Sequence, residues 1–203
     1  NMGLVEINAV RATVDERETG SFNPNVKAQV AINPDSEIIP TTRSNGVLLC
    51  LTAPSGGVVS GQSAVIQLDG WTYEDLTIRS GAGLHINWPL MAAVSDWQLN
   101  ADEKKTVKAR DENMQRLEEF FETARRYDAA RRNDPSTKID VKWESMRDVL
   151  AGKIPVIASA EYANQIQAAV AFSVRQKVKL IISGGYDSIH CTDLLKHHDI
   201  PVI

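Results

Sequence analysis

Short apolar runs recur at near-equal spacing in the C-terminal third of the chain. Runs rich in β-branched residues begin at Ile154, Val178 and Pro201. Between the first two, small and apolar residues fall at helical intervals and form a face that can pack on a sheet. Strands that are apolar on both faces and alternate with helices are typical of a parallel sheet, either doubly wound or closed as a barrel. Residues 46–52 predict a further strand of this kind.

The middle of the chain has a different pattern. Residues 63–71 predict a strand that ends in a turn at Asp69 and Gly70. Residues 76–78 form a second extended run, and residues 83–89 form a third. These runs predict a β-hairpin insertion over about residues 58–98, which we expect to lie over one rim of the sheet.

Two helices are predicted after this insertion. The first runs from about Asp102 to Arg132, with Asn100 as a candidate cap, and a second covers about residues 142–150. The long helix carries an apolar stripe that we interpret as core, made of Val107, Met114, Leu117, Phe121 and Ala124.

Composition narrows the class of protein. The 203 residues are 43% hydrophobic and 24% charged, a balance typical of a globular domain. The net charge of −4 disfavours nucleic-acid binding, and the apolar runs are too short to cross a bilayer, so we expect a soluble protein. Because the chain begins with Asn1, we expect an incomplete N-terminus, and the compartment stays unknown. Cys50 and Cys191 are expected to be free thiols.

Candidate chemistry lies in the loops that follow the predicted strands, because parallel strands bind ligands at their carboxyl ends. Gly184 and Gly185 precede a helix and could bind an anion, although we favour a tight turn, which needs no ligand. The histidines give no metal motif, since His190 and His197 are seven residues apart. His85 either faces a pocket or is a hydrogen-bonded structural group.

Several segments carry a resemblance to a known family. They cover residues 33–40, 43–47, 53–57, 60–64, 68–72 and 83–89, together with the long helix and the last strand–helix units. On these segments the chain resembles the amidohydrolase superfamily, in its imidazolonepropionase-like branch. The resemblance implies a partial TIM-barrel-like (β/α) parallel sheet with a β-hairpin insertion and one long helix, as a single segment over residues 1–203. It also implies hydrolysis of amide or cyclic amide C–N bonds by a metal-dependent site.

The resemblance also implies where metal ligands would stand. Family strands end in histidines that hold zinc or another divalent ion, which activates a water molecule. At the matching positions this chain has Asn1, Ser159 and Gly184. Asparagine and serine are weak zinc ligands and glycine has no side chain, so we expect degenerate pocket positions and no bound cofactor.

Three hypotheses about function follow. The favoured one is a non-catalytic amidohydrolase-like domain that partners the remainder of its parent chain or a second copy, with a small-molecule ligand as an option. The second is an active amidohydrolase completed by residues outside this chain. The third is an α/β module that binds an anion at Gly184 and Gly185. The nearest polar groups for a pocket are His85, Glu161, Asp187 and His190.

Overall fold

One mixed five-stranded sheet forms the centre of the molecule, whose computed structural model describes residues 2–89, 91 and 101–203, with side chains in the last range from residue 107. The strands follow the order β1-β2-β3-β4-β5. They are β1 (Leu49–Thr52), β2 (Val59–Gln67), β3 (Thr77–Asn87), β4 (Val156–Ala160) and β5 (Leu180–Gly184). The first three pair antiparallel, whereas β3, β4 and β5 pair in parallel. The predicted parallel sheet is thus confirmed for its C-terminal part.

The antiparallel part departs from the sequence prediction in two ways. Residues 46–52 supply only the short strand β1, which runs antiparallel to β2 and leaves Leu49 and Leu51 exposed. The predicted strand, turn and strand are present, but they do not lie over the rim. They belong to the sheet, because β3 is continuous and its last residues, from Leu84, pair with β4.

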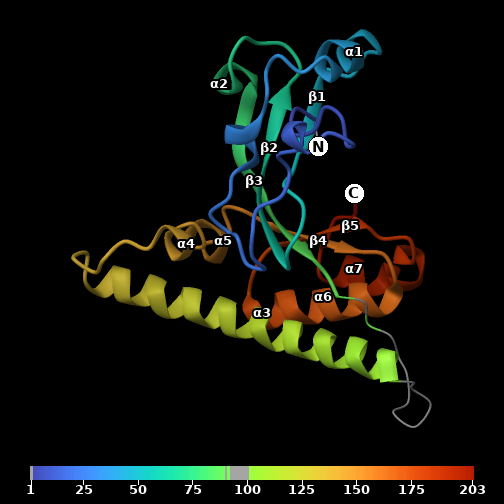
Figure 1. Cartoon of the computed structure of the whole chain (residues 1–203). Helices are drawn as coiled ribbons and strands as arrows, with labels where there is room; N and C mark the ends of the chain where they lie inside the picture. The colour runs from blue at the N-terminus through green and yellow to red at the C-terminus, as the bar shows by residue number, and fades with distance from the viewer. Residues whose placement is uncertain (1, 90, 92–100) are drawn as a thin grey trace.

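The helices surround this sheet unevenly. They are α1 (Ile38–Ser44), α2 (Tyr73–Leu76), α3 (Ala101–Asn133), α4 (Val141–Glu144), α5 (Arg147–Leu150), α6 (Ala163–Gln176) and α7 (Thr192–His197), with 3-10 turns η1 (Arg11–Thr13), η2 (Ala28–Ala31) and η4 (Ser188–Cys191). Figure 1 shows α3 and α6 beneath the parallel strands, while β1, β2 and the first half of β3 project away from them. No helix in the described part of the chain has the length and apolarity to span a membrane.

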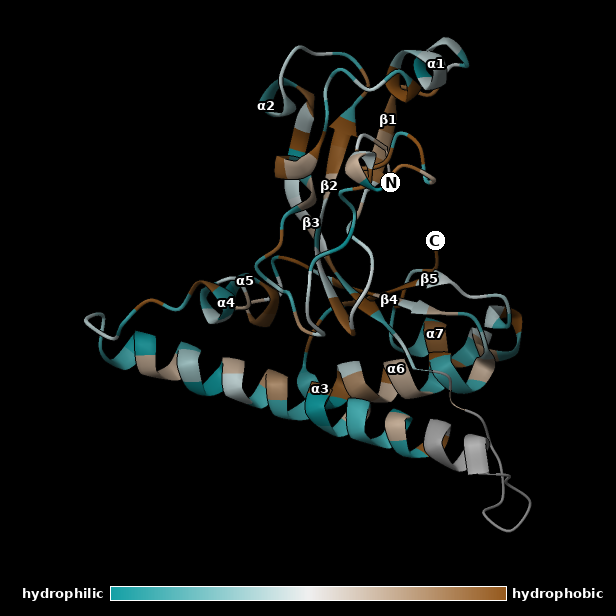
Figure 2. Cartoon of the chain, viewed as in Figure 1, coloured by the Kyte–Doolittle hydropathy of each residue, from teal (hydrophilic) through white to brown (hydrophobic). Residues whose placement is uncertain are grey.

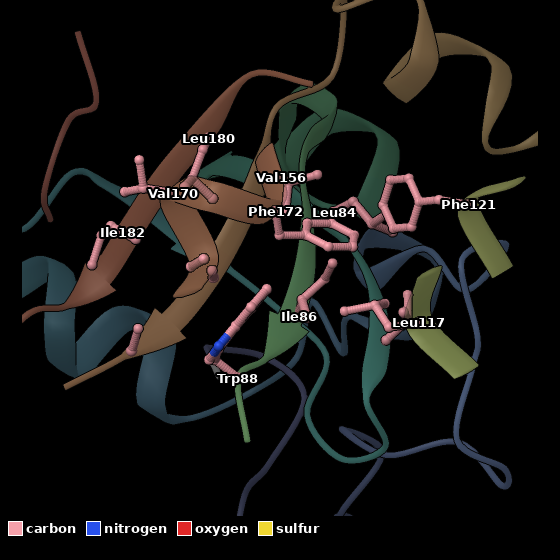
Figure 3. Packing of buried hydrophobic residues seen from close by; sticks show 14 of the residues in the cluster. Leu84, Ile86, Trp88, Leu117, Phe121, Val156, Val170, Phe172, Leu180 and Ile182 are labelled. Carbon is pink, nitrogen blue, oxygen red and sulfur yellow. The ribbon is translucent and has the colours of Figure 1, made fainter. Parts of the chain in front are cut away.

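The main core lies between the parallel strands and the helices α3 and α6. Leu84 and Ile86 of β3 face α3, where they meet Leu117 and Phe121 (Figure 3). Phe172 of α6 packs in the same cluster. The Phe121 and Phe172 rings meet edge to face with centroids 5.1 Å apart. The predicted stripe on the long helix is confirmed for Leu117, Phe121 and Ala124, which are fully buried. Its Asn100 cap lies outside the described residues.

A second, smaller core supports the projecting strands. It joins Ala64 and Ile66 of β2, and Leu68 directly after that strand, to residues of the N-terminal segment such as Leu4 and Ile32. In Figure 2 the apolar colour is concentrated on these strands, whereas α3 is mostly polar. Ala64 and Ile66 therefore anchor the N-terminal segment on one face of the projecting strands.

The region after α3 shows why one predicted helix became two. Asp140 caps α4 by accepting hydrogen bonds from the amides of Lys142 and Trp143, at 2.9 and 3.4 Å. The Ser145 hydroxyl then bonds the Lys142 carbonyl at 2.7 Å, and a new short helix, α5, begins at Arg147. A side-chain hydroxyl that donates to a backbone carbonyl in this way competes with the backbone amides that would bond that carbonyl in a regular helix.

An ion-pair network joins α3 to these short helices. Asp128 accepts hydrogen bonds from Arg147 at 2.9 Å and pairs with Arg132 at 2.7 Å. Arg147 also reaches Glu144 at 2.7 Å. Burial alone would raise the pKa of Asp128, but the bonds from both guanidiniums hold that pKa below its ordinary value.

Candidate functional site

The carboxyl ends of the three parallel strands present a polar row. Asn87 pairs with Ser159 in the register of β3 and β4, and Ser159 pairs with Ser183 in that of β4 and β5. The residues that directly precede Ser159 and Ser183 in their strands, Ala158 and Ile182, belong to the core on the helix side of the sheet. Because side chains alternate along a strand, the row faces the opposite, concave side of the sheet.

His85 lies one row further in on the same concave face. It pairs with Gly61 on β2 and Ile157 on β4. Its Nε2 atom is buried and has no hydrogen-bond partner within the described part of the chain. Burial lowers the pKa of His85 to about 4, so the imidazole is neutral at physiological pH. The structure therefore leaves the buried Nε2 of His85 without a partner among the described residues.

Glu161 ties the two loops after β4 and β5 together. Its carbonyl accepts a hydrogen bond from the Asp187 amide at 2.8 Å, and its carboxylate accepts one from the Tyr186 amide at 3.3 Å. The carboxylate also lies against Gly184, where an added Cβ would sit 2.7 Å from the Glu161 carboxyl carbon. The space for a side chain at position 184 is thus occupied by Glu161.

Asp187 and His190 have structural surroundings. The Asp187 carboxylate accepts a hydrogen bond from the Ala163 amide at 3.1 Å, in the first turn of α6. It makes no side-chain cap at η4, the 3-10 turn that follows it directly. His190 is exposed on η4, and its backbone amide bonds the Asp187 carbonyl at 3.0 Å. Of the four polar groups predicted for a pocket, Glu161, Asp187 and His190 are linked by backbone hydrogen bonds.

The glycine loop does not support an anion site. The amide of Gly184 donates to Ile203, that of Gly185 to Ala160, and those of Tyr186 and Asp187 to Glu161. Each amide of the turn already has an acceptor, and a carboxylate lies beside it. Both observations disfavour an anion, which corrects the third sequence hypothesis in favour of a structural turn.

The residues of this edge do not fit a catalytic zinc ion. Ser159 offers an exposed hydroxyl, Gly184 offers no side chain, and Asn1 lies outside the described residues. Among the residues that the structure describes, no three histidine, cysteine, aspartate or glutamate side chains are grouped to hold a metal ion. Cys50 and Cys191 are free thiols. Burial raises the pKa of both, which keeps them protonated and poor metal ligands.

Comparison with known proteins identifies the architecture. No protein-family model matches the chain, and no curated protein does. A crystal structure of an amidohydrolase from Thermotoga maritima MSB8 superposes on 100% of this chain with a TM-score of 0.85 and 23% sequence identity. The fold is a partial (β/α) barrel. This chain spans 54% of the length of that amidohydrolase, and at this identity the likeness describes the fold alone.

Two further polar residues, Asn87 and Ser183, belong to this edge of the sheet. Asn87 donates hydrogen bonds to the Gly57 carbonyl at 2.8 Å and to the Ser60 hydroxyl at 3.1 Å, which fixes the loop between β1 and β2. Ser183 completes the polar row beside Ser159. The usable signal was alternation: Asn87 is two residues after His85, and Ser183 follows an apolar run just as Ser159 does.

Proposed function

We propose that residues 1–203 form one segment of an amidohydrolase-like barrel that lacks the metal chemistry of the family. The observation that carries this proposal is the carboxyl edge of β4 and β5. Ser159 and Gly184 stand where the sequence resemblance expects histidines, and the Glu161 carboxylate fills the space beside Gly184. In this proposal the polar row is a scaffold surface or a binding surface for a small molecule.

The concave face supports a partner for this segment. Leu49 and Leu51 on β1 are 57% and 39% exposed, and Arg79 of β3 is exposed nearby in the sheet. Apolar side chains on a sheet face favour burial against further protein. We propose that the remainder of a parent barrel, or a second copy of this chain, covers this face.

One observation favours the second candidate, an amidohydrolase completed by residues outside this chain. The unpartnered, neutral imidazole of His85 is in the protonation state that a metal ligand requires. In that case residues from elsewhere would supply the other ligands of the ion.

Equilibrium dialysis of the intact protein against zinc, followed by elemental analysis, separates the two candidates. The proposal predicts no stoichiometric zinc in the wild type and the same zinc content in the His85→Gln variant. Stoichiometric zinc in the wild type that is lost in His85→Gln, but kept in the exposed-site control His190→Gln, would establish the second candidate.

A further inference from the structure

A separate cavity lies at the amino ends of β4 and β5, at the opposite end of these strands from the polar row. Its volume is about 760 Å³. Three connections line it: the segment from α5 into β4, the segment from α6 into β5, and residues 198–201 after α7. Arg79 of β3 completes the wall.

The lining of this cavity carries a surplus of positive charge. Arg79, Lys153, Lys177 and Lys179 contribute to it, whereas Asp199 is the one carboxylate among the lining residues. Lys153 pairs with Asp148 at 3.0 Å. Among the described residues, the other three cations form no ion pair. This surplus occurs in a chain whose net charge is −4.

The neighbouring cavity has a more nearly balanced set of charges. It measures about 550 Å³, and its lining includes Lys27, Arg132, Arg147 and Lys153 beside Asp128, Glu144 and Asp148. Both guanidiniums are matched by Asp128, and Arg147 also by Glu144. By contrast, Arg79, Lys177 and Lys179 around the larger cavity form no ion pair among the described residues, so an incoming anion would meet uncompensated charge.

The backbone gives a second, independent observation. Lys177 and Asp199 have φ values of 49° and 51°, and they are the two non-glycine residues with positive φ in the described chain. Both line this cavity. Lys177 ends α6 at a position where glycine is the common choice, because a Cβ is unfavourable in the left-handed region. A lysine in this conformation lowers the stability of the fold relative to glycine. A role for its charge in ligand binding would account for the lysine.

Most of the remaining lining is apolar, with Ser173 and His198 as its polar side chains. Val174, Val178, Ile181 and Ile200 contribute walls beside the cations, together with Leu150. The end of the Lys179 stem passes over Gly152, with Cε 3.6 Å from where a Cβ would stand, so its ammonium group reaches the connection into β4. Charge and apolar surface are thus combined in one concavity.

We propose that this cavity binds an organic anion, with one phosphate, sulfonate or carboxylate group held by Lys177, Lys179 and Arg79 and an apolar body against the walls. The site is independent of the carboxyl edge and of any chemistry there. Its ligand class follows from unpaired cations beside apolar side chains.

Calorimetric titration of the intact protein with octyl phosphate tests the proposal, with inorganic phosphate and octyl glucoside as head-only and tail-only probes. We expect one site for octyl phosphate, with weaker binding of both partial probes and weaker binding at high salt. Lys177→Gly should weaken binding roughly two- to fivefold without lowering the unfolding midpoint, since glycine relieves the left-handed backbone.

Two further variants make the result specific. Asp199→Gly relieves the same backbone conformation but removes a negative charge, so it should tighten binding. Lys138→Gln changes an exposed lysine outside the cavity and should leave binding unchanged. The proposal is overturned if octyl phosphate does not bind, if either partial probe binds as tightly, or if Lys177→Gly and Lys138→Gln have equal effects.

Discussion

His85 should make the stability of the fold depend on pH. Its imidazole is largely buried on the concave face, and its Nε2 has no partner among the described residues. The pKa falls from 6.5 in a free side chain to about 4 in the folded protein. Between these values the unfolded chain binds more protons than the folded chain. The contribution of His85 is therefore complete above about pH 6.5 and is lost as the pH falls toward 4.

The size of this effect follows from the two pKa values. A shift of one unit corresponds to about 1.4 kcal/mol, so the full window is worth about 3 kcal/mol, of which about 2 kcal/mol falls between pH 7 and pH 5. Because His85 is partly exposed, solvent screens part of this, and we expect about 1–2 kcal/mol between pH 7 and pH 5.

Urea unfolding at pH 7 and pH 5 measures the effect when the wild type is compared with His85→Gln, which cannot titrate. All other groups titrate in both proteins and cancel in the difference. We expect the wild type to lose about 1–2 kcal/mol more than the variant over this range. His190→Gln removes an exposed histidine and should behave as the wild type does. An equal pH dependence for the wild type and His85→Gln would refute the reasoning.

Three further substitutions test the fold and the carboxyl edge by urea unfolding. Phe121→Ala empties the centre of the main core and should cost about 3–5 kcal/mol; a loss below about 1 kcal/mol would contradict the packing. Asp128→Asn should cost about 1–3 kcal/mol at pH 7. That difference should shrink as the pH falls from 3.8 through the lower pKa of Asp128 in the folded protein, because the contribution is complete above the unfolded value and is lost as the folded carboxylate takes up its proton. Gly184→Ala places a side chain at φ 92° against Glu161 and should cost about 1–3 kcal/mol. In a Glu161→Ala background the cost should be smaller, and an unchanged cost would show that the carboxylate does not occupy that space.

The sequence pattern was sufficient for elements with a strong period. The strands that became β4 and β5 are apolar on both faces, and the stripe through Leu117 and Phe121 identified the buried face of the long helix. The projecting β1–β3 region was misplaced because the runs at 76–78 and 83–89 were interpreted as separate. Their junction, residues 79–82 with Gly81, lacks the β-branched and aromatic residues that mark a strand.

The site could be predicted only in part, because its geometry depends on contacts between loops. The sequence singled out Ser159, Gly184 and Glu161 but gave no reason to place the Glu161 carboxylate against Gly184. That contact depends on the parallel register that aligns Ala160 with Gly184. The contact of the Asp187 carboxylate is of the same kind, because its partner is the amide of Ala163, which is 24 residues away in the sequence.

Native mass spectrometry of the intact protein, purified without chelators, tests the central claim most directly, because one spectrum reports bound metal and assembly together. The account predicts masses that contain no zinc or other divalent ion. A species with one divalent ion per chain would contradict it and would direct attention to His85 and to ligands outside residues 1–203.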